Sequence, residues 1–338
     1  MIYVIDLESI PTRYTSEWKW FVPKWLRENE LEVTVIEGDQ EIPEMTTPGA
    51  FLNFGGTNMY KATQVHKISQ LFVEDKIQDG DQFVFTDAWH PGVINIKYMA
   101  KLLGKDITLH GLWHAGSYDP NDFLGRLIGD EKWIRNAEAS FFESFDYNWI
   151  ATHSHEKQIH KVFPDVKLHH TGWPMSYTRD LLDRAKQKER KNIIVFPHRI
   201  APEKRLDLFE ELSKRPELAH YEFRVPMQEN LTKEQYHNLL GTAKFALSFA
   251  EQETLGISMY EAACAGAVPI VPNRLSYIEM YYGGFKTEGT VDAVVNKILE
   301  LESHDLQREV NDQANLLHEH FFSATKLLNK LKEINARR

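Results

Sequence analysis

The sequence predicts an α/β protein with two doubly wound parallel sheets, and three observations carry this prediction. Short β-branched or apolar runs alternate with longer segments of helical periodicity almost from end to end, as expected for parallel strands covered by helices. The alternation occurs in two series, which a polar and basic stretch at 184–191 separates. The chain has 338 residues, 42% of them hydrophobic and 26% charged, which is enough for two globular domains with sizeable cores.

The first series contains five short apolar runs that we expect to be the strands of one domain. Segments with apolar residues at helical spacing lie between these runs and predict the crossover helices. The expected strands are 3–7, 32–37, 83–86, 107–112 and 149–152, and the expected helices include 16–28, 63–72 and 93–103. Gly55 and Gly56 lie ahead of the second of these helices and are expected to form a simple turn, with a glycine loop that approaches a bound phosphate as the alternative.

The second series predicts a second domain, with strands at 192–196, 221–225, 245–248 and 268–271. Its end is followed by a helical tail whose apolar positions need a surface to pack on, so we expect this tail to dock at the domain junction. The expected organisation is an N-terminal domain at 1–175, a C-terminal domain at 176–311, and the tail helix at 312–338.

Composition excludes several classes of protein. Cys264 is the single cysteine, so neither an internal disulfide nor a zinc ribbon is expected, and a reducing compartment is favoured. The first residues carry no basic region ahead of a long apolar run, and no apolar run approaches the roughly 18 residues of a membrane span. We therefore expect a cytoplasmic protein. The net charge of −10 argues against a protein that coats nucleic acid with its whole surface, but it leaves room for local basic patches.

A pair of basic residues follows the expected strand at 192–196. Arg199 and Lys204 lie in a turn that opens a helix, with Pro202 at a position where a helix start tolerates proline. Two cations beside a helix N-terminus can bind an anion such as phosphate, because both charges and the helix dipole stabilise it. The alternative is that both side chains are ordinary solvated surface charges.

A pair of carboxylates follows the expected strand at 245–248. Glu253 and Glu261 are eight residues apart, so a helix that starts near Gly256 would point both into one cleft. Gly256 would let the first amides of that helix approach a diphosphate closely. Glu261 lies in a small, apolar segment, where a carboxylate needs a partner such as a ribose hydroxyl. An exposed helix face is the alternative, and it accounts for Glu253 better than for Glu261.

These two motifs, in this order and each after a strand, resemble the retaining family-4 glycosyltransferases of the GT-B fold. The segment from Glu253 to Val271 is similar to the Glu-x7-Glu signature of that family, and the segment from Arg199 to Lys204 is similar to its basic element upstream. The resemblance covers the C-terminal half well and the N-terminal half weakly. It implies two Rossmann-like domains facing an interdomain cleft, and transfer of a sugar from a nucleotide-diphosphate sugar to a hydroxyl group with retention at the anomeric carbon.

The resemblance also implies roles for individual residues. Arg199 and Lys204 would hold the donor diphosphate and stabilise the charge that develops on it, Glu253 would bind a hydroxyl of the donor sugar, and Glu261 would bind the ribose. Amides around Leu255 and Gly256 would add contacts to phosphate. The fixed cations would make a metal unnecessary, so no metal and no cofactor are expected beyond the co-substrate, for which a UDP-sugar is the first choice.

The family places a histidine of the N-terminal domain near the transferred sugar, and His114 is the first candidate here, with His110 second. Either of them can instead be a structural residue, because the chain has 15 histidines. Two departures from the family pattern are evident: the loop after the first strand contains no glycine, and His198 occupies the position before Arg199 where the family has glycine.

The acceptor is expected on the N-terminal side. Residues 12–27 contain four basic residues, Arg13 and Lys19 among them, and one acidic residue, interleaved with five aromatic residues. Basic and aromatic groups together suit phosphate contacts and base stacking. This pattern and the small size resemble bacteriophage glycosyltransferases that modify hydroxymethylated pyrimidines in DNA, which would have to act on an extruded base. The helical spacing of the aromatic residues equally predicts a core-facing helix.

Asp87 and Asp119 each follow an expected strand and are further acceptor-side candidates, with a turn or capping role as the alternative for both. A glycan, a lipid or a small molecule also remains open as the acceptor. Two other functions remain open as well: a nucleotide-sugar epimerase, which can share the two-domain fold, and a binding module without catalytic activity.

Overall fold

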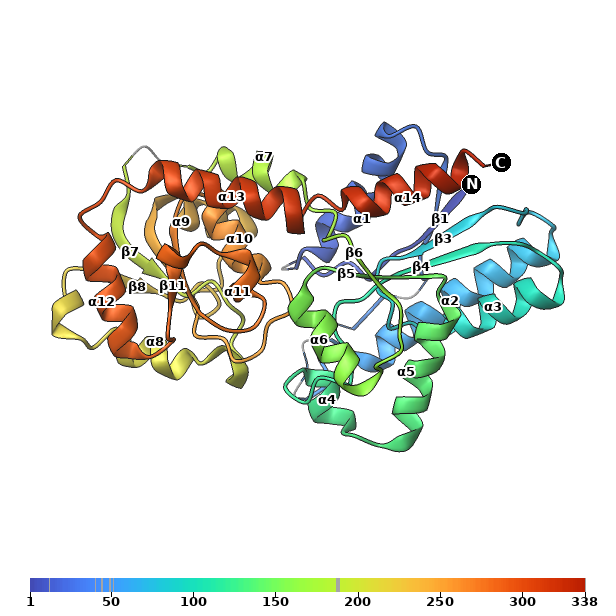
Figure 1. Cartoon of the computed structure of the whole chain (residues 1–338), viewed down its shortest axis with the longest axis horizontal. Helices are drawn as coiled ribbons and strands as arrows, with labels where there is room; N and C mark the ends of the chain where they lie inside the picture. The colour runs from blue at the N-terminus through green and yellow to red at the C-terminus, as the bar shows by residue number, and fades with distance from the viewer. Residues whose placement is uncertain are drawn as a thin grey trace. The chain divides into compact units, whose positions relative to one another are not determined.

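The computed structural model describes residues 1–11, 13–39, 41–43, 45–48, 50, 52–186 and 189–337, and the chain forms two compact units (Figure 1). Unit 1 comprises Met1–Ala151, His155–Pro174 and Ala324–Arg338. Unit 2 comprises Thr152–Ser154 and Met175–Ser323. Each unit has a parallel sheet, so the expected α/β class with two doubly wound sheets is confirmed.

Unit 1 is built on a six-stranded parallel sheet in the order β2-β1-β3-β4-β5-β6. The strands are β1 (Ile2–Ile5), β2 (Val33–Ile36), β3 (Gln82–Phe85), β4 (Thr108–Leu112), β5 (Tyr147–Ile150) and β6 (Leu168–His170). The helices between them are α1 (Thr15–Glu28), α2 (Phe54–Val73), α3 (Gly92–Leu102), α4 (Phe123–Ile128), α5 (Lys132–Ser144) and α6 (His153–Val162). Every residue of β1 and β3 is buried, because helices cover both faces of a doubly wound sheet.

The strand order of unit 1 reverses direction at β1. This strand pairs in parallel with β2 on one side and with β3 on the other, with Val4 opposite both Val35 and Val84. In doubly wound sheets ligands bind beyond the carboxyl ends of the strands at such a switch point. The residues that directly follow β1 and β3 are therefore the first place to look for function in this unit.

Unit 2 is built on a five-stranded parallel sheet in the order β11-β10-β9-β7-β8, with its switch point between β7 and β9. The strands are β7 (Lys191–Val195), β8 (Glu222–Arg224), β9 (Ala243–Leu247), β10 (Val268–Pro272) and β11 (Lys286–Thr287). The α-helices are α7 (Tyr177–Asp183), α8 (Leu206–Leu212), α9 (Lys233–Thr242), α10 (Ile257–Cys264), α11 (Tyr277–Met280), α12 (Val291–Leu301) and α13 (Gln307–Phe321).

The C-terminal tail differs from the single helix predicted for 312–338. It contains the end of α13 and a separate helix, α14 (Thr325–Asn335), with Ala324 between them in the left-handed backbone region at φ 50°. Helix α13 belongs to unit 2 and α14 belongs to unit 1. The break is local, since the left-handed backbone at Ala324 cannot continue a right-handed helix.

Helix α2 also differs from the prediction, because it begins at Phe54 and not near residue 63. Gly55 and Gly56 lie in its first turn and do not form a separate turn. Asn53 caps this helix by accepting a hydrogen bond from the Gly56 amide at 2.8 Å. Among the described residues, no helix is both long and apolar enough to cross a bilayer.

Candidate functional site

Two loops of unit 2 bring charged side chains together at its switch point. The loop after β7 carries His198 and Arg199 and leads into a 3-10 turn at Pro202–Lys204, and the loop after β9 carries Glu253. We call His198, Arg199, Lys204 and Glu253 the unit 2 site. The four residues follow the two adjacent strands at which the chain reverses direction in the sheet. The sheet topology thus joins two sequence segments that lie about fifty positions apart.

Lys204 and Glu253 form the central ion pair of this site. The Lys204 Nζ lies 2.9 Å from Glu253 Oε2 and also donates to the Gln252 carbonyl at 2.6 Å. Both side chains are largely buried, at 7% and 15% exposure. Burial raises the pKa of the Glu253 carboxyl, but the charge and hydrogen bond of Lys204, together with the Gly256 amide and His198, outweigh that effect, so the pKa lies below its usual range. The Glu253 carboxyl is therefore ionised at neutral pH.

Arg199 is held by a neighbour on the same loop. Its Nη2 donates to Oε1 of Glu203, which is nearly fully buried, whereas a third of the Arg199 side chain is exposed. Both cations predicted to bind an anion are thus present at the switch point, each already oriented by a carboxylate of the same unit. A bound anion would share these cations with the two carboxylates.

Helix α10 starts at Ile257, directly after Gly256, where the sequence predicts its start. Gly256 has a φ of 72°, and a Cβ at this position would lie 2.8 Å from Cε1 of Tyr277, so glycine fits the position on both counts. The Gly256 amide hydrogen-bonds the Glu253 carboxylate. Leu255 is buried. The backbone at Leu255 and Gly256 therefore orients Glu253, and phosphate contacts of these amides stay a prediction.

Glu261 lies in the middle of α10 and has a partner from another helix. Its Oε2 accepts a hydrogen bond from the Tyr236 hydroxyl of α9 at 3.0 Å. Burial, followed by the nearby Glu261 carboxylate, raises the pKa of Tyr236 well above its usual value, so this phenol stays a donor. The expected need of Glu261 for a hydroxyl partner is thus met within the protein by Tyr236. A ribose contact at Glu261 stays a prediction.

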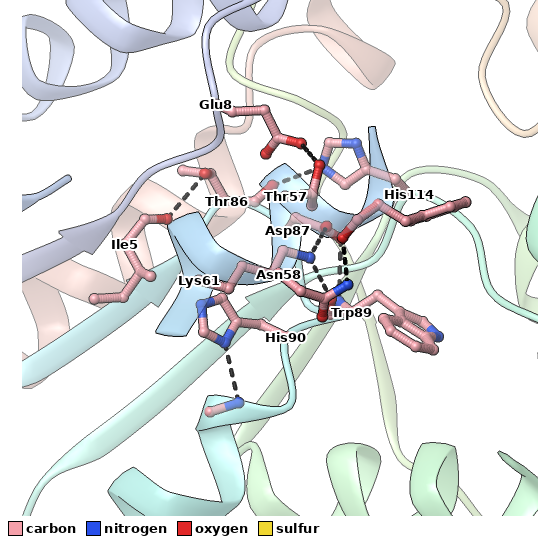
Figure 2. A network of polar contacts seen from close by, with 12 residues as sticks. Ile5, Glu8, Thr57, Asn58, Lys61, Thr86, Asp87, Trp89, His90 and His114 are labelled. Atoms are coloured by element: carbon pink, nitrogen blue, oxygen red, sulfur yellow. Dashed lines mark hydrogen bonds and ion pairs between the residues drawn. The ribbon is translucent and has the colours of Figure 1, made fainter. Parts of the chain in front are cut away.

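The switch point of unit 1 holds a second polar cluster, made of Glu8, Thr57, Lys61, Asp87 and His114, which we call the unit 1 network (Figure 2). Glu8 follows β1, Asp87 follows β3 and His114 follows β4. Glu8 is only 4% exposed; its Oε1 accepts from the Thr57 hydroxyl at 2.6 Å, and its Oε2 has no hydrogen-bond partner in the described part of the chain.

Asp87 is paired with Lys61, whose Nζ lies 3.0 Å from Oδ2, while Oδ1 accepts from the Trp89 amide at 3.1 Å. Burial raises the pKa of Asp87, but Lys61 and His114 counteract it, so the pKa is lowered overall. Asp87 is thus an ionised carboxylate held in place by Lys61 at the end of β3. Asp87 stays a predicted acceptor-side residue, and its pairing with Lys61 has no signal in the sequence.

His114 uses both ring nitrogens within unit 1. Its Nε2 lies 2.6 Å from the Thr86 carbonyl, which can only accept, so Nε2 carries the proton and donates. Its Nδ1 then accepts from the Tyr14 hydroxyl at 2.7 Å. Burial lowers the pKa of His114 to about 4, so the ring is neutral at pH 7. A sugar-contacting role for His114 stays a prediction, and it would have to compete with Tyr14.

His110 and Asp119, two other candidates, lie in different surroundings. His110 is inside β4 and fully buried, with Nε2 paired to Gln82 and Nδ1 accepting from Trp149. An acceptor-side role for His110 stays a prediction. Asp119 is buried in a turn, where its Oδ1 accepts from the Asn121 amide at 2.9 Å. This contact is typical of a turn, and an acceptor-side role for Asp119 stays a prediction.

The basic and aromatic segment at 12–27 forms the start and body of α1, apart from Thr12, which lies outside the described residues. Trp18 and Phe21 are buried, as the helical spacing predicted, while Trp20 is half exposed. Lys19 lies 3.0 Å from Glu37, an acidic partner outside the segment. Arg13 lies over the ring of Tyr14 at 5.5 Å. In the second basic stretch, 184–191, residues 187 and 188 lie outside the described residues.

Glu8, Lys61 and Tyr14 were not among the predicted site residues. Glu8 carries a signal in the sequence, because it follows β1 as Asp87 follows β3. Lys61 lies on α2 at a position without a distinguishing pattern, and Tyr14 directly precedes α1 within the basic and aromatic segment at 12–27. They reach the site only through tertiary contacts with Asp87 and His114.

The chain is similar to known proteins over a short segment of sequence and, more widely, in its fold. No family model matches the chain. A curated relative, the tRNA-queuosine alpha-mannosyltransferase of Drosophila melanogaster, is 42% identical over 52 residues, which is 15% of this chain and 14% of that protein. The GtfA/B complex aligns with a TM-score of 0.53 and 13% identity over 80% of this chain, which spans 61% of that structure.

Structures that align over almost the whole of both chains include two sugar-phosphate synthases. The UDP-forming alpha,alpha-trehalose-phosphate synthase of Burkholderia xenovorans has a TM-score of 0.67 at 10% identity and covers 99% of each chain. The sucrose-phosphate synthase of Thermosynechococcus elongatus has a TM-score of 0.66 at 10% identity and covers 100% of this chain and 99% of its own. At these identities the likeness shows the fold. With its two parallel α/β sheets, the chain has the GT-B fold.

Proposed function

We propose that this protein is a retaining glycosyltransferase that moves a sugar from a nucleotide-diphosphate sugar to a hydroxyl group. The observation that carries the proposal is the unit 2 site: Lys204 paired with Glu253, with Arg199 on the same loop as Lys204, at the switch point of a Rossmann-like sheet in a GT-B fold. A nucleotide-binding domain offers this position for ligands. The charges present there suit a diphosphate flanked by a sugar.

In this proposal Arg199 and Lys204 bind the diphosphate and stabilise the negative charge that grows on it as the sugar leaves. Lys204 has three N–H donors and uses two of them on Gln252 and Glu253 among the described residues, so a phosphate oxygen can take the third. Glu253 is ionised and accepts a hydrogen bond from a hydroxyl of the donor sugar. Glu261 accepts a hydrogen bond from a ribose hydroxyl in addition to the one from Tyr236. No residue is assigned as a covalent nucleophile, because in this proposal the acceptor attacks from the face of the leaving group.

UDP is the first choice for the nucleotide, since one full-length structural neighbour is UDP-forming by its name. The acceptor hydroxyl is assigned to unit 1, where Glu8 and Asp87 offer ionisable oxygens beside His114. The curated relative is named for queuosine in tRNA, which favours a modified nucleoside over a glycan or a lipid. A hydroxymethylated pyrimidine in DNA, as in bacteriophage enzymes, stays a prediction, because none of the relatives described above is named for DNA.

The donor assignment is tested with Arg199→Ala and Lys204→Ala. Each variant should weaken use of the nucleotide-diphosphate sugar by at least about tenfold, equivalent to about 1.4 kcal/mol, because an ionic contact to the diphosphate is lost. The measurement is the rate at which nucleoside diphosphate is released, by hydrolysis or by transfer, from a panel of UDP-, GDP- and ADP-sugars. Arg215→Ala is the control, since Arg215 pairs with Glu217 and Asp292 elsewhere in unit 2. Unchanged kinetics in both site variants would refute the assignment.

The acceptor is identified by mass shift after incubation with the active donor. The panel holds DNA with and without hydroxymethylated pyrimidines, tRNA, oligosaccharides, lipids and small alcohols. If DNA is the acceptor, Lys19→Ala with Lys24→Ala should weaken DNA binding and flatten its salt dependence. An unaltered salt dependence would reject Lys19 and Lys24 as DNA contacts. Glu37 and Glu28 already form ion pairs with these two lysines.

Isomerisation of the donor without any acceptor would instead favour an epimerase. Nucleotide binding without turnover across the panel would favour a binding module.

A further inference from the structure

His198 keeps a buried nitrogen without a hydrogen-bond partner beside the charged residues of the unit 2 site. The residue follows β7 and directly precedes Arg199, and it is only 3% exposed. Its Nδ1 lies 3.1 Å from the Ser258 hydroxyl in the first turn of α10. Its Nε2 has no partner among the described residues, although a buried polar atom left in this state destabilises the fold.

The imidazole of His198 is neutral in this environment. Burial lowers its pKa to about 3, and the positive charge of Lys204 adds to this effect. A neutral ring has one N–H and one lone pair, and the Ser258 hydroxyl can serve either tautomer because it both donates and accepts. When Ser258 donates to Nδ1, the proton lies on Nε2, and the unpartnered atom is a hydrogen-bond donor.

The surrounding charges select an anion as the missing partner. Arg199 and Lys204 both act on the His198 ring, and each of them is itself a hydrogen-bond donor that cannot accept from Nε2–H. A phosphate oxygen accepts from all three groups at once, and it is the ligand that the two cations favour. Phe196 packs edge-on against the ring at 5.1 Å and fixes its plane.

We propose that the Nε2–H of His198 donates a hydrogen bond to a phosphate oxygen of the bound nucleotide, beside Arg199 and Lys204. The proposal rests on the proposed function and adds a third donor to it, at a position where the resembling family has glycine and therefore no side chain. A residue with no hydrogen-bonding group at this place could not supply this contact. His198 thus belongs to the donor-binding residues of this chain.

Two substitutions separate the two ring nitrogens. His198→Gln carries an amide nitrogen near the place of Nε2 and can still donate to phosphate, whereas His198→Asn carries its amide near Nδ1 and reaches only Ser258. Binding of UDP, GDP and ADP to the full chain is measured by calorimetry, and the diphosphate bound most tightly by the wild type is compared with its parent nucleoside. His198→Asn should lower the affinity for the diphosphate by about tenfold and leave the affinity for the nucleoside unchanged. The diphosphate affinity of His198→Gln should stay within about threefold of the wild-type value.

The outcomes divide as follows. Equal diphosphate affinity of His198→Asn and the wild type overturns the proposal, and so does an equal loss for diphosphate and nucleoside, which would mark a purely structural role. If Lys204→Ala loses diphosphate affinity while His198→Asn does not, this inference fails and the proposed function stands. If the wild type binds none of the three diphosphates, the proposed function fails and this inference fails with it.

Discussion

Asp6 shows how a single buried carboxyl group can govern the pH dependence of the fold. It follows β1 in unit 1, where its Oδ1 accepts from the Tyr60 hydroxyl at 2.8 Å and from Gln64 Nε2 at 3.0 Å. Its Oδ2 is buried without a partner in the described part of the chain. Burial therefore outweighs these hydrogen bonds and raises the pKa of Asp6 to about 7.

The substitution Asp6→Asn should remove a pH-dependent loss of stability. The pKa of Asp6 is about 7 in the folded state against 3.8 for the unfolded chain, so between these values the folded state binds more protons. Its stabilising contribution is complete below pH 4 and is lost as the pH rises toward 7. Between pH 4 and pH 8 the free energy of unfolding of the wild type, measured with urea, should fall by about 2–4 kcal/mol relative to that of Asp6→Asn.

The control for this measurement is Asp130→Asn, at an exposed position of the same unit. Its unfolding free energy should follow the wild-type pH dependence. Parallel pH profiles for the wild type and Asp6→Asn would show that the Asp6 carboxyl is ionised in the folded protein at neutral pH.

The cations of the unit 2 site lead to a prediction about metals. If Arg199 and Lys204 supply the positive charge at the leaving diphosphate, glycosyl transfer should keep at least about half of its rate in excess EDTA. The rate is measured by release of nucleoside diphosphate before and after chelation. Loss of transfer with EDTA and its recovery on addition of Mg²⁺ would contradict the assignment of these two residues.

At the scale of an element, α10 is the structure on which the unit 2 site depends. Its first residue follows Gly256, whose positive φ allows the chain to turn from the Glu253 loop into the helix. The same glycine amide holds the Glu253 carboxylate, and Ser258 in the first turn holds His198. The start of this helix therefore orients one anion and one neutral ring of the site.

The substitution Gly256→Ala should unsettle the helix start and weaken nucleotide binding. The left-handed backbone costs about 1–2 kcal/mol for alanine, and the contact of Cβ with Tyr277 at 2.8 Å adds to this cost. The free energy of unfolding and the nucleoside diphosphate affinity are measured together. Gly104→Ala is the matched control, because it has a φ of +65° and open space around Cβ. Equal destabilisation by the two substitutions would exclude a steric role of Tyr277.

At the scale of the whole molecule, the two units are not contiguous in sequence. Unit 1 is completed by the last helix of the chain, α14, although the unit 2 series lies in between. Leu327 and Leu331 of this helix are buried, and the Leu331 carbonyl accepts a hydrogen bond from Gln82 of β3. The Leu327 amide donates to the Thr171 hydroxyl at 2.9 Å. The C-terminus therefore contributes to the stability of the N-terminal sheet.

The substitution Leu331→Ala should destabilise unit 1 by about 2–5 kcal/mol, because it leaves a cavity in a buried contact. Amide hydrogen exchange followed by mass spectrometry should show faster exchange in β1 and β3 and unchanged exchange in β7 and β9. Leu328→Ala, on a half-buried position of the same helix, should have a smaller effect. Faster exchange in both sheets would mean that the units unfold together.

The order of most strands and helices could be predicted because periodicity is a local property, whereas the short edge strands β6 and β11 are not among the strands that the alternation predicted. Every strand expected from the alternation overlaps an observed strand, and the start of α10 follows Gly256 as expected. The positions of Arg199, Lys204 and Glu253 after strand ends follow from the same local pattern. Two boundaries were wrong for local reasons as well: the Asn53 cap extended α2, and the backbone at Ala324 divided the tail.

The partners of the site residues could not be predicted in this way. The order of the strands brings segments that are distant in sequence together at the carboxyl edge of each sheet. This is why Lys204 contacts Glu253, Glu8 contacts Thr57, and His114 contacts Tyr14. His110 and His114 look alike in sequence, yet one lies within β4 and the other beyond its end. The unpartnered nitrogen of His198 is visible only once all its neighbours are in place. Local patterning thus specifies which segments form strands and helices, while pairing between distant side chains depends on how the sheets are ordered and packed.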